Sequence, residues 1–361
     1  MTLLFAVLGL ALLTAGGEAL VRGASRLALG LGISPLVIGL TVVAFGTSAP
    51  ELAVSARAAL SGGADLALGN VVGSNIFNVL FVLGASALIT PLVVSARLVR
   101  VDVPLLVGTS LAVWLFALDG TISRPEGLVL FAGVIAYTAL TIVQSRRESA
   151  AVRQEYADVH GRGTPRSATD WAVDLGLVAG GLVLLVVGAG WLVDGAVALA
   201  RWLGITELVI GLTIVAAGTS LPEVAASLVA AVRGERDIAV GNVVGSCLFN
   251  LLAVLGAASA LAPSGIGVPA AALAFDVPVM VAVAVACLPV LAPLGVARWQ
   301  GALLLGWYAA YVLYLVLDAQ GHEGVDALAA ALAWFALPLT AISLGILGWR
   351  SLPGSRGPAA S

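Results

Sequence analysis

The chain has 361 residues, of which 60% are hydrophobic and only 10% are charged, and its mean hydropathy is +1.09. Soluble domains carry about 25% charged residues, so this composition excludes a water-facing surface and indicates a protein that lies in lipid. The formal charge of −3 comes without a basic patch, which argues against a nucleic-acid partner. Cys247 and Cys287 lie in apolar segments, so neither a disulfide framework nor a zinc site is expected.

Apolar runs of about 20 residues, the length that crosses a hydrocarbon core of about 30 Å, recur along the whole chain. We therefore predict an all-α polytopic membrane protein with eleven spans. The second and seventh spans contain Gly-Thr-Ser-x-Pro-Glu and are expected to be broken, because proline removes an amide donor and disrupts the preceding turn. In chain order the predicted spans are 2–21, 31–60, 66–91, 102–118, 126–144, 171–193, 204–232, 238–262, 270–293, 298–317 and 327–349.

The arginines predict how these spans are oriented. If the N-terminus lies outside, fourteen arginines fall on the cytoplasmic side and only Arg57, Arg124 and Arg201 fall outside. Basic residues favour the cytoplasmic side of a membrane. We therefore expect a multi-pass protein of the cell inner (plasma) membrane, with its N-terminus outside and, after eleven spans, its C-terminus in the cytoplasm.

An internal repeat relates two parts of the chain. Residues 30–85 align with residues 202–257 without a gap, at a constant offset of 172, with 36 identities in 56 positions. Shared Leu, Val and Ala are expected of any two apolar segments, but Thr, Ser, Pro, Glu, Asn and Gly held in register are not. Since the second span matches the seventh, five crossings later, the two copies enter the membrane in opposite directions. Such inverted repeats are typical of secondary transporters, whose binding sites lie between them.

The repeat also predicts the organisation of the chain. The first five-helix repeat covers residues 1–144, a cytoplasmic linker covers 145–170, and the second, inverted repeat covers 171–317. An extra C-terminal helix and tail occupy 318–361. The linker is too short for a folded regulatory domain.

Glu51 and Glu223 are the most informative residues of the repeat. A carboxylate in the middle of a span costs roughly 2.5 to more than 10 kcal/mol, and it persists where it faces a partner, an ion or water. Pro50 and Pro222 free nearby carbonyls, which a bound cation can satisfy. The side chains that recur with them all offer oxygen, which hard cations such as calcium prefer, and no His or Cys for zinc or copper accompanies them. These side chains are Thr47, Ser48, Thr219, Ser220, Ser74, Ser246, Asn78 and Asn250.

Several readings remain open at this point. Two carboxylates can neutralise one divalent cation, share sodium ions, or hold protons, so the coupling ion is undecided. Serine and threonine in membrane helices commonly bond to a carbonyl of their own helix, and Asn70 and Asn242 could equally cap or pack helices. Glu18 and Asp194 lack an acidic counterpart in the other repeat and are expected at the membrane interface.

These motifs resemble those of the cation/calcium exchanger superfamily, in particular the prokaryotic sodium/calcium exchangers. The two alpha-repeats of that family carry Gly-Thr-Ser-x-Pro-Glu on one helix and Gly-Ser-Asn-x-x-Asn or Asp on the next. Here the corresponding segments are Gly46–Glu51 with Gly73–Asn78, and Gly218–Glu223 with Gly245–Asn250. The resemblance covers residues 1–317 in architecture.

The resemblance implies a ten-helix exchanger with four clustered cation sites between the repeats. Glu51 and Glu223 would be the shared ligands, joined around calcium by Thr47 and Thr219, and Asn78 and Asn250 would lie at the central position. The first and sixth helices would slide across the remaining bundle to switch access. The sodium sites would be formed by Ser48, Ser220, Ser74, Ser246 and the carbonyls of Ala44 and Ala216.

Three features depart from the family pattern. Many sodium-coupled members have Asp where this chain has Asn250, and proton-coupled relatives commonly lack that Asp too. Those relatives, however, usually carry Gly-Asn-x-x-Glu in place of the motif that occurs twice here. The eleventh helix lies outside the ten-helix pattern, and the short central loop lacks the calcium-sensing domains of animal plasma-membrane exchangers.

The leading hypothesis is therefore calcium export against sodium entry, with calcium/proton antiport as the alternative. Transport of another divalent cation, a channel, or an intramembrane enzyme with Glu51 and Glu223 as acid and base are less favoured. The chain has no nucleophile set, metalloprotease motif or cofactor motif, so we expect no enzyme activity and no cofactor. The expected partners are calcium, sodium or protons, and the lipid bilayer, with no obligatory protein partner.

Overall fold

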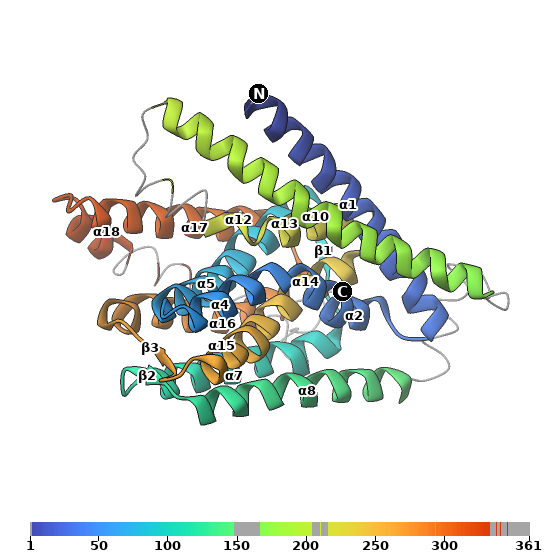
Figure 1. Ribbon diagram of the computed structural model, residues 1–361, viewed down its shortest axis with the longest axis horizontal. Coiled ribbons are helices and arrows are strands. Elements are labelled where there is room, and N and C mark those ends of the chain that lie inside the picture. Colours follow the sequence, from blue (N-terminus) through green and yellow to red (C-terminus); the bar gives the residue numbers. More distant parts are fainter. Residues whose placement is uncertain are drawn as a thin grey trace, which may run out of the picture.

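The computed structural model describes residues 2–147, 167–203, 210, 216–292 and 294–332, together with residues 337, 340 and 345. The first half comprises the helices α1 (Thr2–Leu31), α2 (Pro35–Ile38), α3 (Ala44–Thr47), α4 (Ala49–Leu60), α5 (Ala64–Phe77), α6 (Gly84–Ile89), α7 (Val103–Ala117) and α8 (Arg124–Arg147). The second half comprises α10 (Ala168–Trp202), α12 (Ala216–Gly218), α13 (Leu221–Val232), α14 (Arg236–Phe249), α15 (Leu255–Leu261), α16 (Val277–Leu291), α17 (Arg298–Ala319) and α18 (Val325–Ala331). Figure 1 shows these helices as one packed bundle.

The predicted spans are confirmed over most of the described chain. Eight described helices are long and apolar enough to cross a membrane, and the bent pair Pro35–Thr47 and Ala49–Leu60 makes a ninth span with a 45° bend. The second span is therefore broken at its motif, as predicted. Of the seventh span, the structure describes residue 210, α12 and the apolar helix α13.

Two predicted spans are too short. The first was expected to end at residue 21 and the sixth at residue 193, but α1 continues to Leu31 and α10 covers Ala168–Trp202. Basic side chains do not end α1, because Arg22 and Arg26 form ion pairs with Glu18 and Asp174 from within the helix. The long first and sixth helices therefore extend beyond the apolar runs from which they were predicted.

The burial pattern is that of a membrane protein. Helix α14 continues to Leu261, and the apolar part of this span is completely buried. The equivalent span in the first half, Leu66–Ile89, is mostly buried. Large apolar side chains such as Leu128, Ile135 and Val183 are instead exposed, as expected of a surface that faces lipid. The spans that begin with α5 and α14 thus form the centre of the bundle, and the outer helices shield them from the bilayer.

Helices α1 and α10 pack closely along their length and lie together across one side of the bundle (Figure 1). Gly9 faces Gly188, and Gly16 faces Gly181, so closely that a methyl group on either partner would lie under 3.0 Å from the opposing backbone. Small residues allow such contact between membrane helices. Residues further along α1 contact residues nearer the start of α10. The two helices are therefore antiparallel, in agreement with an inverted repeat.

Ion pairs attach α1 to its neighbours. Arg26 lies 3.8 Å from Asp174 on α10, and Glu18 accepts hydrogen bonds from Arg233 at the end of α13, one of them 2.7 Å long. At the repeat offset of 172, Glu18 corresponds to Gly190 and Arg233 to Ser61. The Glu18–Arg233 pair, which joins the two halves, therefore has no symmetric counterpart.

Two short antiparallel strand pairs connect the halves. Strand β1 (Leu92–Val93) pairs with β4 (Gly295–Val296), and β2 (Thr121–Ile122) pairs with β3 (Ile266–Gly267). The amides of Val94 and Val268 extend the two pairs by bonds of 2.9 Å to the carbonyls of Leu294 and Gly120. Since β1 and β2 precede and follow α7, the two pairs lie at opposite ends of the bundle.

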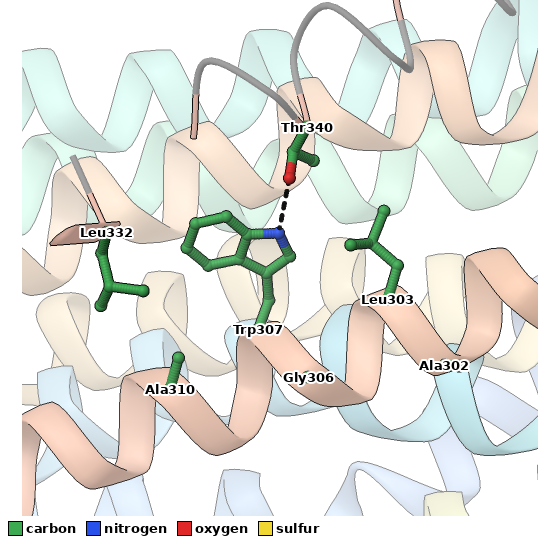
Figure 2. A pocket seen from close by; sticks show the side chains of 7 residues that line it. All are labelled: Ala302, Leu303, Gly306, Trp307, Ala310, Leu332 and Thr340. Carbon is green, nitrogen blue, oxygen red and sulfur yellow. Dashed lines mark hydrogen bonds between the residues drawn. The ribbon is translucent and has the colours of Figure 1, made fainter. Parts of the chain in front are cut away.

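Most of the predicted eleventh helix, residues 327–349, lies outside the described residues. Helix α18, Leu332 and three single residues of this region are described, and two of them, Leu332 and Thr340, border a pocket of about 310 Å³ beside α17 (Figure 2). Trp307 donates its indole N–H to the Thr340 hydroxyl across 3.2 Å in this pocket. The pocket is mainly apolar and contains none of the predicted ion ligands; its lining residues are Ala302, Leu303, Gly306, Trp307, Ala310, Leu332 and Thr340.

Candidate cation-binding site

The first motif forms the break between α3 and α4. Helix α3 ends at Thr47, and Pro50 lies in the first turn of α4, where the missing amide is tolerated. Pro50 cannot donate to the carbonyl four residues earlier, that of Gly46. The Ala44 carbonyl remains in use, because it accepts the Ser48 amide at 3.0 Å and the Thr47 hydroxyl at 3.3 Å.

The second motif forms an equivalent break. Helix α12 ends at Gly218, a turn follows over residues 219 and 220, and α13 begins at Leu221 with Pro222 in its first turn. Ala216 begins α12, and its side chain lies outside the described residues. Both breaks place the glutamate of the motif in the first turn of the following helix, where the amide ends of the helix favour negative charge.

The two carboxylates are buried and linked across the halves. Glu51 and Glu223 are both 0% exposed. Ser220 donates to Glu51 Oε1 at 3.0 Å, and Ser48 donates to Glu223 Oε1 at the same distance. Each glutamate thus accepts a hydrogen bond from the serine of the opposite motif. The Oε2 atom of each has no hydrogen-bond partner within the described part of the chain.

Further hydroxyls join this cluster from the two central helices. Ser220 lies 3.1 Å from the Ser74 hydroxyl on α5, and Thr47 lies 3.4 Å from the Ser246 hydroxyl on α14. Ser74 and Ser246 are buried. The structure therefore brings the predicted serine and threonine ligands of both halves against the same pair of carboxylates.

Asn78 and Asn250 occupy the same helix faces as these serines, because each lies four residues beyond Ser74 or Ser246. A π-helical segment begins at each of them, η2 (Asn78–Leu83) and η5 (Asn250–Val254), a deviation that is frequent at functional sites. Both amides are 0% exposed. Neither amide atom of Asn78, nor Oδ1 of Asn250, has a partner among the residues described.

Asn70 and Asn242, for which the sequence left open either a capping or packing role or a role at the site, belong to the same network. The Asn70 amide donates to Ser55 at 2.9 Å and to the Glu51 carbonyl at 3.3 Å, and its Oδ1 accepts from Thr219 at 3.4 Å. Asn242 repeats this arrangement in the other half with its own serine, glutamate and threonine. Ser55 and Ser227, the serine partners, were missed, although their identity at the repeat offset was a signal for them.

The cluster has the chemistry of a cation site. Two carboxylates are buried with one oxygen atom each unpaired, and the surrounding groups are hydroxyls, amides and carbonyls. An uncompensated charge in a medium of low dielectric is strongly unfavourable, and a bound cation would supply the missing interaction for both Oε2 atoms. Oxygen donors of this kind suit calcium and sodium.

The chain matches the sodium/calcium exchanger protein family over residues 1–143 and 173–317. It belongs to that family. The exchanger is therefore a multi-pass membrane antiporter and not an enzyme, and the resemblance seen in its motifs is confirmed.

Known relatives support this assignment along nearly their full length. The putative antiporter CaxA of Alkalimonas amylolytica is 40% identical over 315 residues, which cover 85% of this exchanger and 96% of CaxA. The sodium/calcium exchanger MaX1 of Methanosarcina acetivorans is 31% identical over 344 residues, 86% of this chain and 97% of that one. A structure of the sodium-calcium exchanger NCX_Mj, soaked without Na⁺ and Ca²⁺, superposes with a TM-score of 0.74 at 31% identity and covers 87% and 98% of the two chains.

The exchanger also contains two carboxylate–phenol pairs that the sequence analysis missed, one buried and one partly buried. Tyr137 donates to Asp102 at 3.1 Å, and Tyr311 donates to Asp276 at 3.0 Å. The members of the two pairs recur at an offset of 174 rather than 172, beyond the gapless alignment. Extending the alignment through a two-residue insertion would have revealed them. Each pair joins two helical segments of its own half, so we assign it to helix packing.

Proposed function

We propose that this exchanger exports calcium in exchange for sodium entry, by alternating access to a site between Glu51 and Glu223. The observation that carries the proposal is the pair of buried carboxylates, each with an unpaired oxygen, inside an oxygen-only ligand set. Calcium would bind both glutamates with Thr47 and Thr219. Sodium ions would use the same carboxylates with Ser48, Ser74, Ser220, Ser246 and the Ala44 and Ala216 carbonyls.

Shared ligands explain why the exchange is obligatory. An empty site would leave two buried negative charges facing each other, which strongly disfavours movement across the membrane. Either calcium or a set of sodium ions compensates those charges. The antiparallel pair α1 and α10 is the element that we expect to slide, because its tight glycine contacts favour movement as one unit.

Calcium/proton antiport is the second candidate, and the amide at Asn250 favours it. With amides at both Asn78 and Asn250, the central position lacks the carboxylate found in many sodium-coupled members. Protons on Glu51 and Glu223 would then replace sodium as the counter-charge. The sodium proposal is preferred because the Ser48 and Ser220 hydroxyls, which protons would not need as ligands, lie within 3.0 Å of the carboxylates.

The test is calcium uptake by the purified protein in liposomes. Sodium-loaded vesicles are diluted into sodium-free medium with radioactive calcium, beside potassium-loaded vesicles and vesicles with an imposed pH gradient. We expect uptake only with internal sodium, and no uptake by Glu51→Gln or Glu223→Gln. Glu126→Gln is the matched control, because Glu126 caps α8 through Ser123 and lies outside the cluster.

The other outcomes discriminate between the candidates. Uptake that follows the pH gradient and ignores sodium would establish proton coupling, and Asn250→Asp should then introduce sodium dependence. Flux without any counter-ion gradient would indicate a channel. No calcium movement under either gradient would refute the proposed substrate.

The location proposed for the exchanger is the inner (plasma) membrane, with the N-terminus outside. The arginine distribution supports this orientation, and a relative with 34% identity over 314 residues is the inner membrane protein YrbG of Escherichia coli. Single cysteines placed in the α1–α2 and α4–α5 loops test it. Impermeant reagents should label the second loop from outside and the first only after permeabilisation.

A further inference from the structure

Asn70 and Asn242 each use their whole amide group to connect both halves of the exchanger. On the Asn70 side, the contacts are with Ser55 and the Glu51 carbonyl in the first half and with Thr219 in the second. Asn242 contacts Ser227, the Glu223 carbonyl and Thr47 in the same pattern. The pattern thus occurs twice, in two different local environments.

The orientation of each amide follows from its partners. A backbone carbonyl can only accept a hydrogen bond, so the atom of Asn70 that faces the Glu51 carbonyl must be the nitrogen. The oxygen then faces Thr219, whose hydroxyl must donate. The same reasoning places the oxygen of Asn242, 3.2 Å from Thr47, where it accepts the Thr47 proton.

This arrangement determines where the threonine lone pairs point. A hydroxyl that binds a cation directs a lone pair at the ion and must give its proton to another acceptor. Thr219 has that acceptor in Asn70. Thr47 also lies near the Ala44 carbonyl, but that carbonyl already accepts the Ser48 amide and belongs to the expected ligand set. The Ser246 hydroxyl, 3.4 Å from Thr47, belongs to the expected ligand set as well. With an ion bound, Asn242 is the acceptor that remains for the Thr47 proton.

We propose that Asn70 and Asn242 are positioning residues that hold the threonine of the opposite half with its lone pairs toward the shared cation. This inference rests on the proposed function, in which Thr47 and Thr219 are calcium ligands. Each asparagine also holds the carbonyl of its own glutamate, so it fixes one ligand from each half relative to the other. The site is thereby preorganised by residues that do not touch the ion.

A purely structural role makes a different prediction. If Asn70 only joined α4 to α5, its effect would depend on Ser55, the partner in its own half, and calcium affinity would follow stability. The positioning role predicts that its effect depends on Thr219. The crossed pattern supplies an internal control, because Asn70 contacts Thr219 and not Thr47, whereas Asn242 contacts Thr47.

The experiment is a double-mutant cycle on equilibrium binding of radioactive calcium to the purified protein. Asn70→Leu should weaken binding by about tenfold, the lower range for groups that orient metal ligands. Thr219→Val, which removes the ligand itself, should weaken binding at least as much, and the double variant should be no weaker than the worse single one. Asn70→Leu combined with Thr47→Val should multiply the two effects. Ser55→Ala should lower the unfolding temperature with little loss of affinity.

Multiplicative effects of Asn70→Leu and Thr219→Val, or dependence on Ser55 in place of Thr219, would overturn the inference. The equivalent cycle of Asn242 with Thr47 repeats the test. Should the leucine variants fail to fold, a calcium-bound structure of the natural chain decides. It should place Thr219 Oγ1 at about 2.3–2.6 Å from the ion and in hydrogen-bond contact with Asn70; a broken Thr219–Asn70 contact would refute the role.

Failure of this inference is distinguishable from failure of the proposed function. Calcium uptake by the natural protein tests the function by itself. If the natural protein binds no calcium but binds radioactive sodium, the function proposal fails, and the same cycle measured with sodium still tests whether the asparagines act through the threonines.

Discussion

The contact between α1 and α10 can be tested by adding one methyl group to it. Gly181→Ala would place a Cβ atom 2.6 Å from the Leu20 amide nitrogen and 2.8 Å from the Gly16 carbonyl oxygen. Both atoms belong to the backbone of α1, so no side-chain rotation relieves the overlap. The helices themselves would have to separate.

The expected size of the effect follows from these distances. Carbon atoms pack best at about 3.5–4.0 Å from their neighbours, so the shorter contact must lengthen by roughly 0.9–1.4 Å. Overpacking of this kind costs about 1–3 kcal/mol. The neighbouring residue provides the control, because a Cβ atom on Gly180 would meet no atom within 4 Å. Gly180→Ala should instead gain up to about 1 kcal/mol from helix propensity.

The assay is thermal unfolding in detergent, followed by tryptophan fluorescence, with exchange activity measured in liposomes. We expect Gly181→Ala to unfold at a lower temperature than the natural protein and Gly180→Ala at the same or a higher one. Exchange should slow only in Gly181→Ala, because the separated helices no longer slide as one unit. Equal unfolding temperatures for the two variants would refute the close packing of α1 on α10.

Three further predictions concern other parts of the molecule. Glu18→Gln removes an ion pair with Arg233 that joins the two halves and has no symmetric counterpart, so it should shift the balance between the two access states. Accessibility of a reporter cysteine from each membrane side would measure this, and unchanged accessibility would show that the pair has no influence. Tyr137→Phe should destabilise the protein by about 0.6–1.7 kcal/mol, the range for hydrogen bonds between membrane helices. The loss should exceed that of Tyr311→Phe, because Asp102 is fully buried and Asp276 is not. Steric trapping measures both stabilities, and the reverse order would contradict this reasoning. Cys247 and Cys287 are buried free thiols, so maleimide should label them only as the protein unfolds, and rapid labelling of the native protein would contradict that burial.

Much of the candidate site could be predicted because its residues occur twice. A lone Glu51 in an apolar segment could be a packing residue, but Glu223 with the same Thr, Ser and Pro in register is difficult to explain without a shared role. The break at Ser48 was likewise predictable, since it follows from the missing amide of Pro50. Repetition and backbone chemistry therefore carried most of the prediction.

What the sequence could not provide is the pairing between halves. Nothing in the spacing of Ser48 and Glu51 indicates that the serine donates to Glu223 instead of its own glutamate. Such a contact depends on how the two breaks face each other in space. The ends of α1 and α10 were missed for a related reason, because charged side chains such as Arg26 were taken to end a span although a partner on the adjacent helix, Asp174, holds them.

The strand pairs β1–β4 and β2–β3 limit how the exchanger can move. Each joins a loop of one half to a loop of the other, and together they hold the halves at both ends of the bundle. Two halves joined in this way cannot separate by a hinge motion between them, since opening either end would break the hydrogen bonds of a strand pair. In the proposed exchange cycle, access to the glutamates would then change by movement of parts outside these connections, such as α1, α10 and the broken helices. The same connections make each half incomplete by itself, because half of every strand pair is contributed by the other.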